Sequence, residues 1–70
     1  MVSDRFVVRL IRAREPQYQL AASVGMSPSR LSRIVQAKHA EVGPLTDADR
    51  RALEQIAARL GLTIAETFVE

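Results

Sequence analysis

The chain has 70 residues, 47% hydrophobic and 4% aromatic, with a net charge of +2, which allows one domain, residues 1–70, with a small aliphatic core. The lack of cysteine excludes disulfides and thiolate zinc sites, and the lone histidine cannot form a metal site by itself. No apolar run approaches the roughly 18 residues that span a bilayer, so we expect a soluble cytoplasmic protein without membrane contacts. We also expect no cofactor and no small-molecule substrate.

The first helix is expected to begin after Ser3 and to run to about Arg14. Its apolar residues recur at the spacing of one buried helix face; they are Phe6, Val7, Leu10 and Ile11. Pro16 ends this helix, because proline disfavours the helical conformation in the residue before it. Glu15 and Pro16 form a short joint, after which a second helix is expected over about residues 17–24.

A glycine turn joins the second helix to a third. The inward residues of the second helix are Leu20, Ala21 and Val24, and Gly25 allows the left-handed backbone that ends a helix. Ser27 caps the third helix, which has Pro28 in its first turn and is expected to run to about Ala37. Its inward residues are Leu31, Ile34 and Val35. We expect Ala21 where the two helices approach most closely.

The second half of the chain is also helical in pattern. Residues 38–45 contain a Gly-Pro turn and are expected to form a surface loop. Thr46 caps a fourth helix, which stops at Gly61; its inward residues are Leu53, Ile56, Ala57 and Leu60. Thr63 and Glu66 then form a capping box that opens a short fifth helix.

The unit of two helices and a turn over residues 17–34 is the most informative stretch of the chain. Any one of its signals is typical of an ordinary small helical bundle. For the second of these two helices to project from the surface, however, four features must keep their separations at once. They are the small residue at the crossing, the glycine, the cap and the apolar stripe. Together they predict a helix-turn-helix, and with it DNA binding.

The charge of the chain is divided unevenly along its length. Residues 1–38 hold seven basic and two acidic side chains, a net charge of +5, whereas residues 39–70 hold three basic and six acidic ones, a net charge of −3. The positive charge therefore lies with the expected helix-turn-helix, where it favours an approach to phosphates. For Arg5, Arg9 and Arg12, which form one stripe of the first helix, the alternative is a solvated helix face.

The order and spacing of these elements resemble those of the lambda-repressor-like helix-turn-helix family, the Cro-type or XRE-family DNA-binding domains of phages and bacteria. Six residues carry the resemblance in the bihelical unit: Gln17, Ala21, Gly25, Ser27, Leu31 and Ile34. The segment IAARLGLTIAETF, residues 56–68, resembles the family's ending, in which helix four gives way to a glycine and a capped helix five. The resemblance implies a compact all-α bundle of five helices, whose third helix enters the major groove.

The resemblance also implies which side chains read the bases. Three match positions of the third helix that reach base edges: Ser29, Ser32 and Arg33. Arg30 lies beside them, for a base or a phosphate. Arg33 is the strongest candidate, because a guanidinium makes a bidentate contact with guanine. Pro28 departs from the family, which often has a polar base-reading residue there, so specificity is expected to be narrower or to rely on DNA shape.

Four residues are candidates for contacts with the DNA backbone: Gln17, Ser27, Lys38 and His39. Gln17 resembles the family's glutamine that touches the backbone and supports the reading helix, and its alternative is an ordinary polar residue of a first turn. Lys38 and His39 follow the third helix in a loop slightly longer than usual, where simple solvation is the alternative.

The end of the chain carries more apolar residues than one or two helical turns can bury. We therefore predict a dimer interface at Ile64, Phe68 and Val69. The alternative for Phe68 is that it folds back on the core of its own monomer. Two copies are expected because one reading helix makes few contacts, and a twofold dimer requires an inverted-repeat site whose halves lie roughly 34 Å apart.

The leading functional prediction is a sequence-specific, double-stranded DNA-binding regulator of transcription of the repressor or Cro type, acting as a homodimer. No catalytic constellation or phosphate-binding glycine loop is present, so no enzyme activity is expected. One alternative is a protein-interaction module, of the antitoxin or anti-repressor type, that uses the apolar last helix. Another is an excisionase-like accessory protein of recombination, which would bend its DNA site.

Overall fold

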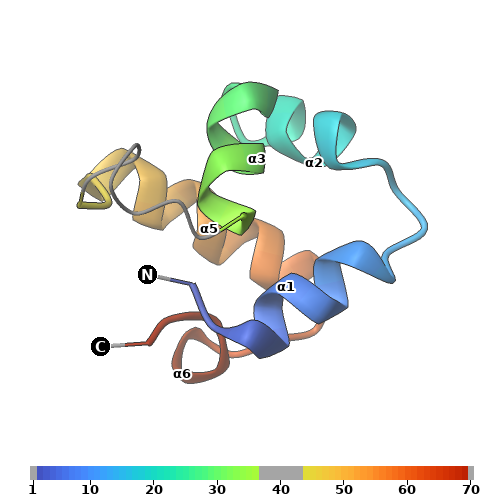
Figure 1. The fold of residues 1–70 in the computed structure, drawn as a ribbon, viewed down its shortest axis with the longest axis vertical. Coiled ribbons are helices and arrows are strands. Elements are labelled where there is room, and N and C mark those ends of the chain that lie inside the picture. The colour runs from blue at the N-terminus through green and yellow to red at the C-terminus, as the bar shows by residue number, and fades with distance from the viewer. Residues whose placement is uncertain (1, 37–43, 70) are drawn as a thin grey trace.

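The structure is a computed structural model that describes residues 2–36 and 44–69. Five helices form within these residues (Figure 1); they are α1 (Asp4–Ile11), α2 (Gln17–Ser23), α3 (Pro28–Val35), α5 (Asp47–Arg59) and α6 (Ile64–Thr67). An isolated antiparallel bridge joins Val2 to Phe68. The prediction of an all-α class is confirmed for this part of the chain.

The helices enclose one aliphatic core. In Figure 1, α2 and α3 lie together on one side, α1 and α6 lie on the other, and α5 crosses between the two pairs. The largest apolar side chains with less than 2% exposure come from four of the helices; they are Phe6, Leu10, Leu20, Leu31, Leu53 and Ile56. Each of them belongs to an inward stripe predicted from the sequence, so the helical periodicity located the centre of the core correctly.

Helix α1 is shorter than predicted, and its inward face is narrower. The helix ends at Ile11, and the N–H of Ala13 donates to the carbonyl of Leu10 at 3.2 Å in a tighter turn. Ile11 was expected to be buried but is 67% exposed. It lies about 100° around the helix from Leu10, which turns it away from a core face centred on Phe6 and Leu10. The expected inward residue Val7 is only half-buried.

Polar caps define most helix starts. Ser3 accepts the N–H of Phe6 at 3.1 Å at the start of α1. Thr46 and Asp49 form a complete capping box at α5, and Thr63 and Glu66 form another at α6, as predicted for the latter. Ser27 occupies the cap position of α3 as expected, but its side chain makes no capping hydrogen bond.

The two ends of the described chain lie side by side. The N–H of Ser3 donates to the carbonyl of Thr67 at 2.7 Å, and the buried hydroxyl of Thr67 donates to the carbonyl of Thr63 at 2.7 Å. Arg5 and Glu66 form an ion pair at 2.8 Å between the same segments. The bond from Ser3 and the ion pair of Arg5 hold α6 against the start of α1. Within the described ranges, no helix has the length and apolar character needed to cross a bilayer.

Candidate nucleic-acid interface

The turn between α2 and α3 is determined by its own backbone hydrogen bonds. Gly25 has a φ of +74°, and its N–H donates to the carbonyl of Ala22 at 3.2 Å. The N–H of Met26 donates to the carbonyl of Ala21 at 2.9 Å, which completes a Schellman ending. Met26 and Ala21 are both buried next to this bond. The turn therefore sets how α3 leaves α2, and it repeats at the end of α5, where Gly61 has a φ of +79°.

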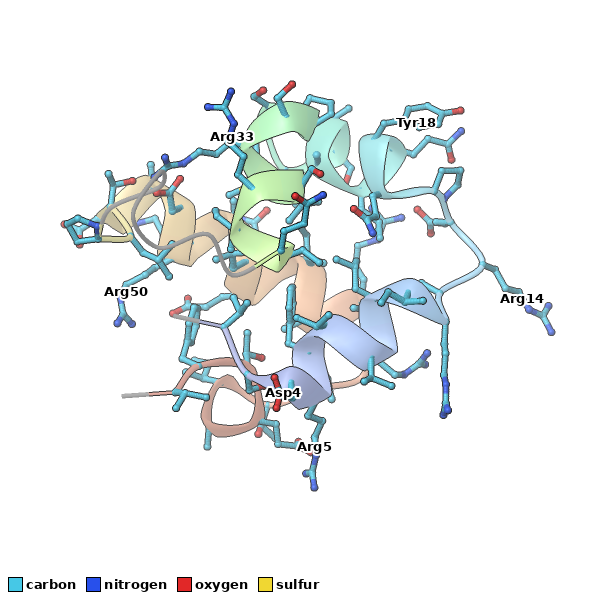
Figure 2. The ribbon with its side chains drawn as sticks, viewed as in Figure 1. Asp4, Arg5, Arg14, Tyr18, Arg33 and Arg50 are labelled. Atoms are coloured by element: carbon cyan, nitrogen blue, oxygen red, sulfur yellow. The ribbon has the colours of Figure 1, made fainter. Side chains whose placement is uncertain are left out.

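Helix α3 has one buried and one exposed side. Leu31 and Ile34 are buried, whereas Ser29 and Arg33 are exposed. Figure 2 shows Arg33 extending from α3 away from the body of the molecule. Ser29 and Arg33 are separated by four residues, so they lie on one stripe of the helix. Two of the three predicted base-contacting residues are therefore brought together on the outer surface.

The third predicted base-contacting residue, Ser32, is half-buried. Its hydroxyl accepts a hydrogen bond from the side-chain amide of Gln36 at 3.3 Å. Gln36 is exposed and lies three residues beyond Arg33, on the same stripe. Sequence reasoning missed Gln36, although its type and spacing were available: a glutamine amide can pair with adenine in the major groove.

Arg30 points to a different partner from the one expected. Its Nε and Nη2 donate to the two carboxylate oxygens of Asp49 at 3.3 and 2.6 Å, across 19 residues of sequence. Asp49 is 8% exposed and also accepts the backbone N–H of Thr46 at 3.0 Å. The hydrogen bond from Arg30 lowers the pKa of Asp49 below its usual value, while burial of the carboxyl group opposes the shift. Arg30 therefore joins α3 to the start of α5.

We expect Asp49→Asn to destabilise the protein by about 1 kcal/mol at neutral pH, because the amide keeps the shape but loses the charge that holds Arg30. A lowered pKa means that the unfolded state binds the proton more readily, so the contribution of Asp49 is fully present above about pH 4 and is lost as the pH falls through the lower value of the folded state. Urea unfolding at several pH values should show the two proteins converging at low pH.

The matched control is Asp47→Asn, which removes an exposed acid from the same first turn of α5. Its effect should be limited to the loss of a favourable interaction with the helix dipole. The pKa of Glu66 is also lowered, by the backbone N–H of Thr63 and by Arg5, but Glu66 is present in every variant and cancels. Equal losses for Asp49→Asn and Asp47→Asn would show that the ion pair contributes nothing.

The start of α2 presents polar groups beside α3. Gln17 is the first residue of α2 and is half-buried, and Ser27 is exposed at the cap of α3. Tyr18, which sequence reasoning did not select, is 60% exposed. Figure 2 shows Tyr18 and Arg33 extending from the side of the molecule that α2 and α3 form. Lys38 and His39, the other predicted backbone contacts, lie outside the described residues.

The three predicted interface residues near the end of the chain have different surroundings. Phe68 packs partly buried against the core, and the guanidinium of Arg50 lies 4.9 Å from the centre of its ring. Ile64 and Val69 are 61% and 48% exposed. Phe68 therefore folds back on its own monomer, which was the alternative stated for it. Of the three predicted interface residues, Ile64 and Val69 are the ones that stay exposed.

No group of three or more His, Cys, Asp or Glu side chains gathers as metal ligands within residues 2–36 and 44–69. Comparisons of the chain with protein-family models, with curated proteins and with solved structures found no match. The function is therefore inferred from the geometry of α2, α3 and the residues around them.

Proposed function

We propose that α2, the glycine turn and α3 form a helix-turn-helix, and that the protein binds double-stranded DNA in a sequence-specific manner as a regulator of transcription. The observation that carries this proposal is the exposed stripe of α3. Ser29, Arg33 and Gln36 lie along it, and all three can form hydrogen bonds with base edges in the major groove. The opposite side of α3 is buried, so the stripe faces solvent on a supported helix.

The support of α3 also favours this function. Recognition of bases requires a helix held in one orientation, because a misplaced side chain loses its hydrogen bonds. The Schellman turn at Gly25 holds one end of the unit, and the ion pair of Arg30 with Asp49 holds α3 to α5. We therefore assign Arg30 to positioning the reading helix, and base contacts to Arg33 with its neighbours.

The proposed contacts with the DNA backbone come from Gln17 and Ser27, at the starts of α2 and α3. The hydroxyl of Ser27 is not used for capping, which leaves it for a phosphate oxygen. We extend this set to Tyr18, whose exposed hydroxyl can donate to the same backbone. The order of the five described helices supports a lambda-repressor-like domain, and Pro28 supports a contribution from DNA shape.

Selection of bound duplexes from a random pool, followed by measurement of affinity against salt, tests the proposal. We expect an enriched sequence with inverted symmetry, and a log–log salt slope that reflects the release of several counterions. A pool without enrichment would refute sequence-specific recognition. Binding of a protein with little dependence on salt would favour the second candidate, a protein-interaction module.

The second candidate is favoured by the exposed apolar residues Ile64 and Val69, because a docked partner helix would cover them. In the DNA-binding proposal the same residues form the contact between two subunits, with two reading helices roughly 34 Å apart. The two readings differ in what covers this surface, another protein or a second copy of the chain.

Val69→Asp is expected to leave the monomer folded and to weaken dimerisation by about tenfold or more, because an unpaired carboxylate would be buried between the subunits. Sedimentation of the variant with and without its DNA site measures the effect. Val8→Asp is the matched control, since Val8 on α1 is 46% exposed and Val69 is 48% exposed. If only Val8→Asp prevents dimerisation, the interface lies on α1.

A further inference from the structure

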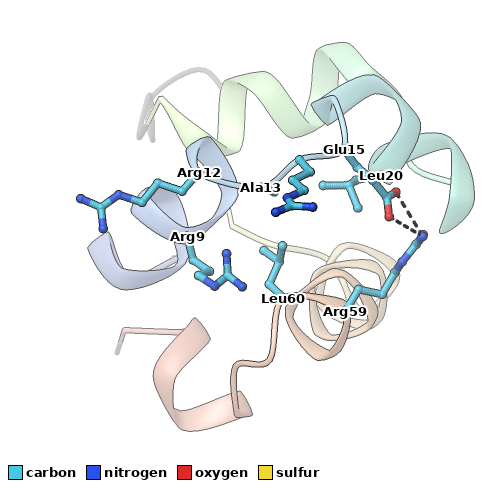
Figure 3. A pocket seen from close by; sticks show the side chains of 8 residues that line it. Arg9, Arg12, Ala13, Glu15, Leu20, Arg59 and Leu60 are labelled. Atoms are coloured by element: carbon cyan, nitrogen blue, oxygen red, sulfur yellow. Dashed lines mark hydrogen bonds and ion pairs between the residues drawn. The ribbon is translucent and has the colours of Figure 1, made fainter.

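Arginine side chains gather around a hollow on a part of the surface that the DNA-binding proposal does not use. The hollow has a volume of about 270 Å³ and lies between α1, the connecting residues 12–16, and the end of α5 (Figure 3). Its charged lining consists of Arg9, Arg12, Arg14, Glu15 and Arg59. Four cations and one anion therefore surround this small space, a formal charge of +3.

The single acid is already used by one of the arginines. Nη2 of Arg59 donates to the two carboxylate oxygens of Glu15 at 3.0 and 3.1 Å, and Nη1 donates to the hydroxyl of Ser23 at 2.8 Å. The side chains of Arg9, Arg12 and Arg14 make no hydrogen bond or ion pair with any residue in the described ranges. These three arginines therefore have no counter-charge from the described residues; in Figure 3 the guanidinium of Arg12 extends away from the hollow, whereas that of Arg9 lies beside it.

The helix ends account for part of this charge and leave part unexplained. Arg9 and Arg59 lie in the last turns of α1 and α5, where the helix dipole favours cations. Arg14 lies between the end of α1 and the start of α2, outside every helix, so no helix dipole accounts for its position. In Figure 3, Arg9 lies between α1 and Leu60, while Arg59 closes the opposite side through its bond to Glu15.

We propose that this hollow binds a phosphoryl group. Guanidinium forks match the oxygen geometry of phosphate and give charge-assisted hydrogen bonds, and several of them around one anion remove their mutual repulsion. The buried side chains of Leu20 and Leu60 close the inner side of the hollow. The volume is below the usual range for drug-sized ligands and suits one or two phosphoryl groups.

The phosphoryl group has two possible sources, a free phosphorylated small molecule or a phosphate of the DNA backbone beyond the reading helix. Inorganic pyrophosphate is the probe for the first. We expect it to raise the melting temperature of the full chain in a saturable manner, beyond the effect of sodium chloride at equal ionic strength. In a variant carrying Arg9→Gln and Arg14→Gln, the affinity for pyrophosphate should fall by about tenfold or more, because each lost charged hydrogen bond is worth about that factor.

Arg51→Gln is the matched control, because Arg51 is an exposed arginine of α5 that does not line the hollow. It removes one charge and should leave the response to pyrophosphate unchanged. A loss in this control equal to the loss in the double variant would show that pyrophosphate senses only net charge, and would overturn the proposal.

The second arm measures the salt dependence of binding to a selected DNA duplex. If the DNA backbone supplies the phosphate, the double variant should lower the slope by about one to two, and Arg51→Gln should not. If the parent protein does not respond to pyrophosphate and the double variant leaves the salt slope unchanged, the hollow holds no phosphoryl site and its arginines are solvated. Should the protein bind no DNA at all, the first arm alone decides, so the two proposals fail separately.

Discussion

Replacement of Ala21 by leucine is expected to destabilise the protein by about 1 to 3 kcal/mol, which corresponds to a fall in melting temperature of about 4 to 24 °C for a domain of this size. Ala21 has no exposed surface and lies on the buried side of α2, a helix that packs against α3 and α5. Its carbonyl also accepts the N–H of Met26 that closes the turn. Three added carbon atoms have no space at this fully buried position, so the helices packed around Ala21 must shift. Thermal unfolding followed by circular dichroism measures the loss.

The neighbouring Ala22 supplies the control for this experiment. It is exposed on the same helix, so Ala22→Leu changes volume and helix propensity in the same way without entering the core. Its melting temperature should stay close to that of the parent protein. If Ala21→Leu melted like Ala22→Leu but no longer bound DNA, Ala21 would be a surface contact and the proposed register of the two helices would be wrong.

Arg33→Ala is expected to weaken binding to the preferred DNA site by about 1 to 3 kcal/mol and to weaken binding to unrelated sequences much less. The side chain of Arg33 is exposed and extends away from the body of the molecule, as Figure 2 shows. Its removal should therefore leave the free energy of unfolding nearly unchanged. The measurement is a comparison of affinities for the selected duplex and for a scrambled duplex at one salt concentration.

Arg51→Ala removes the same charge from an exposed position of α5 and controls for the loss of net charge. The substitution should weaken binding to both duplexes slightly and to the same extent. If Arg33→Ala also weakened binding to both duplexes equally, Arg33 would only position the domain on the phosphates. Base recognition would then have to come from Ser29 and Gln36.

Features that depend on near neighbours in the chain were predictable. The helix ends at Gly25 and Gly61 need a positive φ, and glycine is the residue that adopts it without steric cost. The capping box at Thr63 joins residues three positions apart. The prediction for α1 was less accurate, since its last turn was placed at Arg14 and the helix ends at Ile11. At that end, the tighter turn closed by the N–H of Ala13 and the carbonyl of Leu10 competes with continuation of the α-helix. The periodicity of the apolar residues does not decide between the two.

Within the described residues, the sequence by itself determined the helical class, the order of the helices and the centre of the core, because local hydrogen bonds and a period of 3.6 residues encode them. Only the tertiary structure decided which residues far apart in the sequence meet. It directed Arg30 to Asp49, placed Phe68 against Val2 and Arg50, and gathered the arginines around the hollow beside Glu15. Partners separated by 18 to 66 residues have no periodic signal in the chain, so their meeting depends on how the packed helices cross.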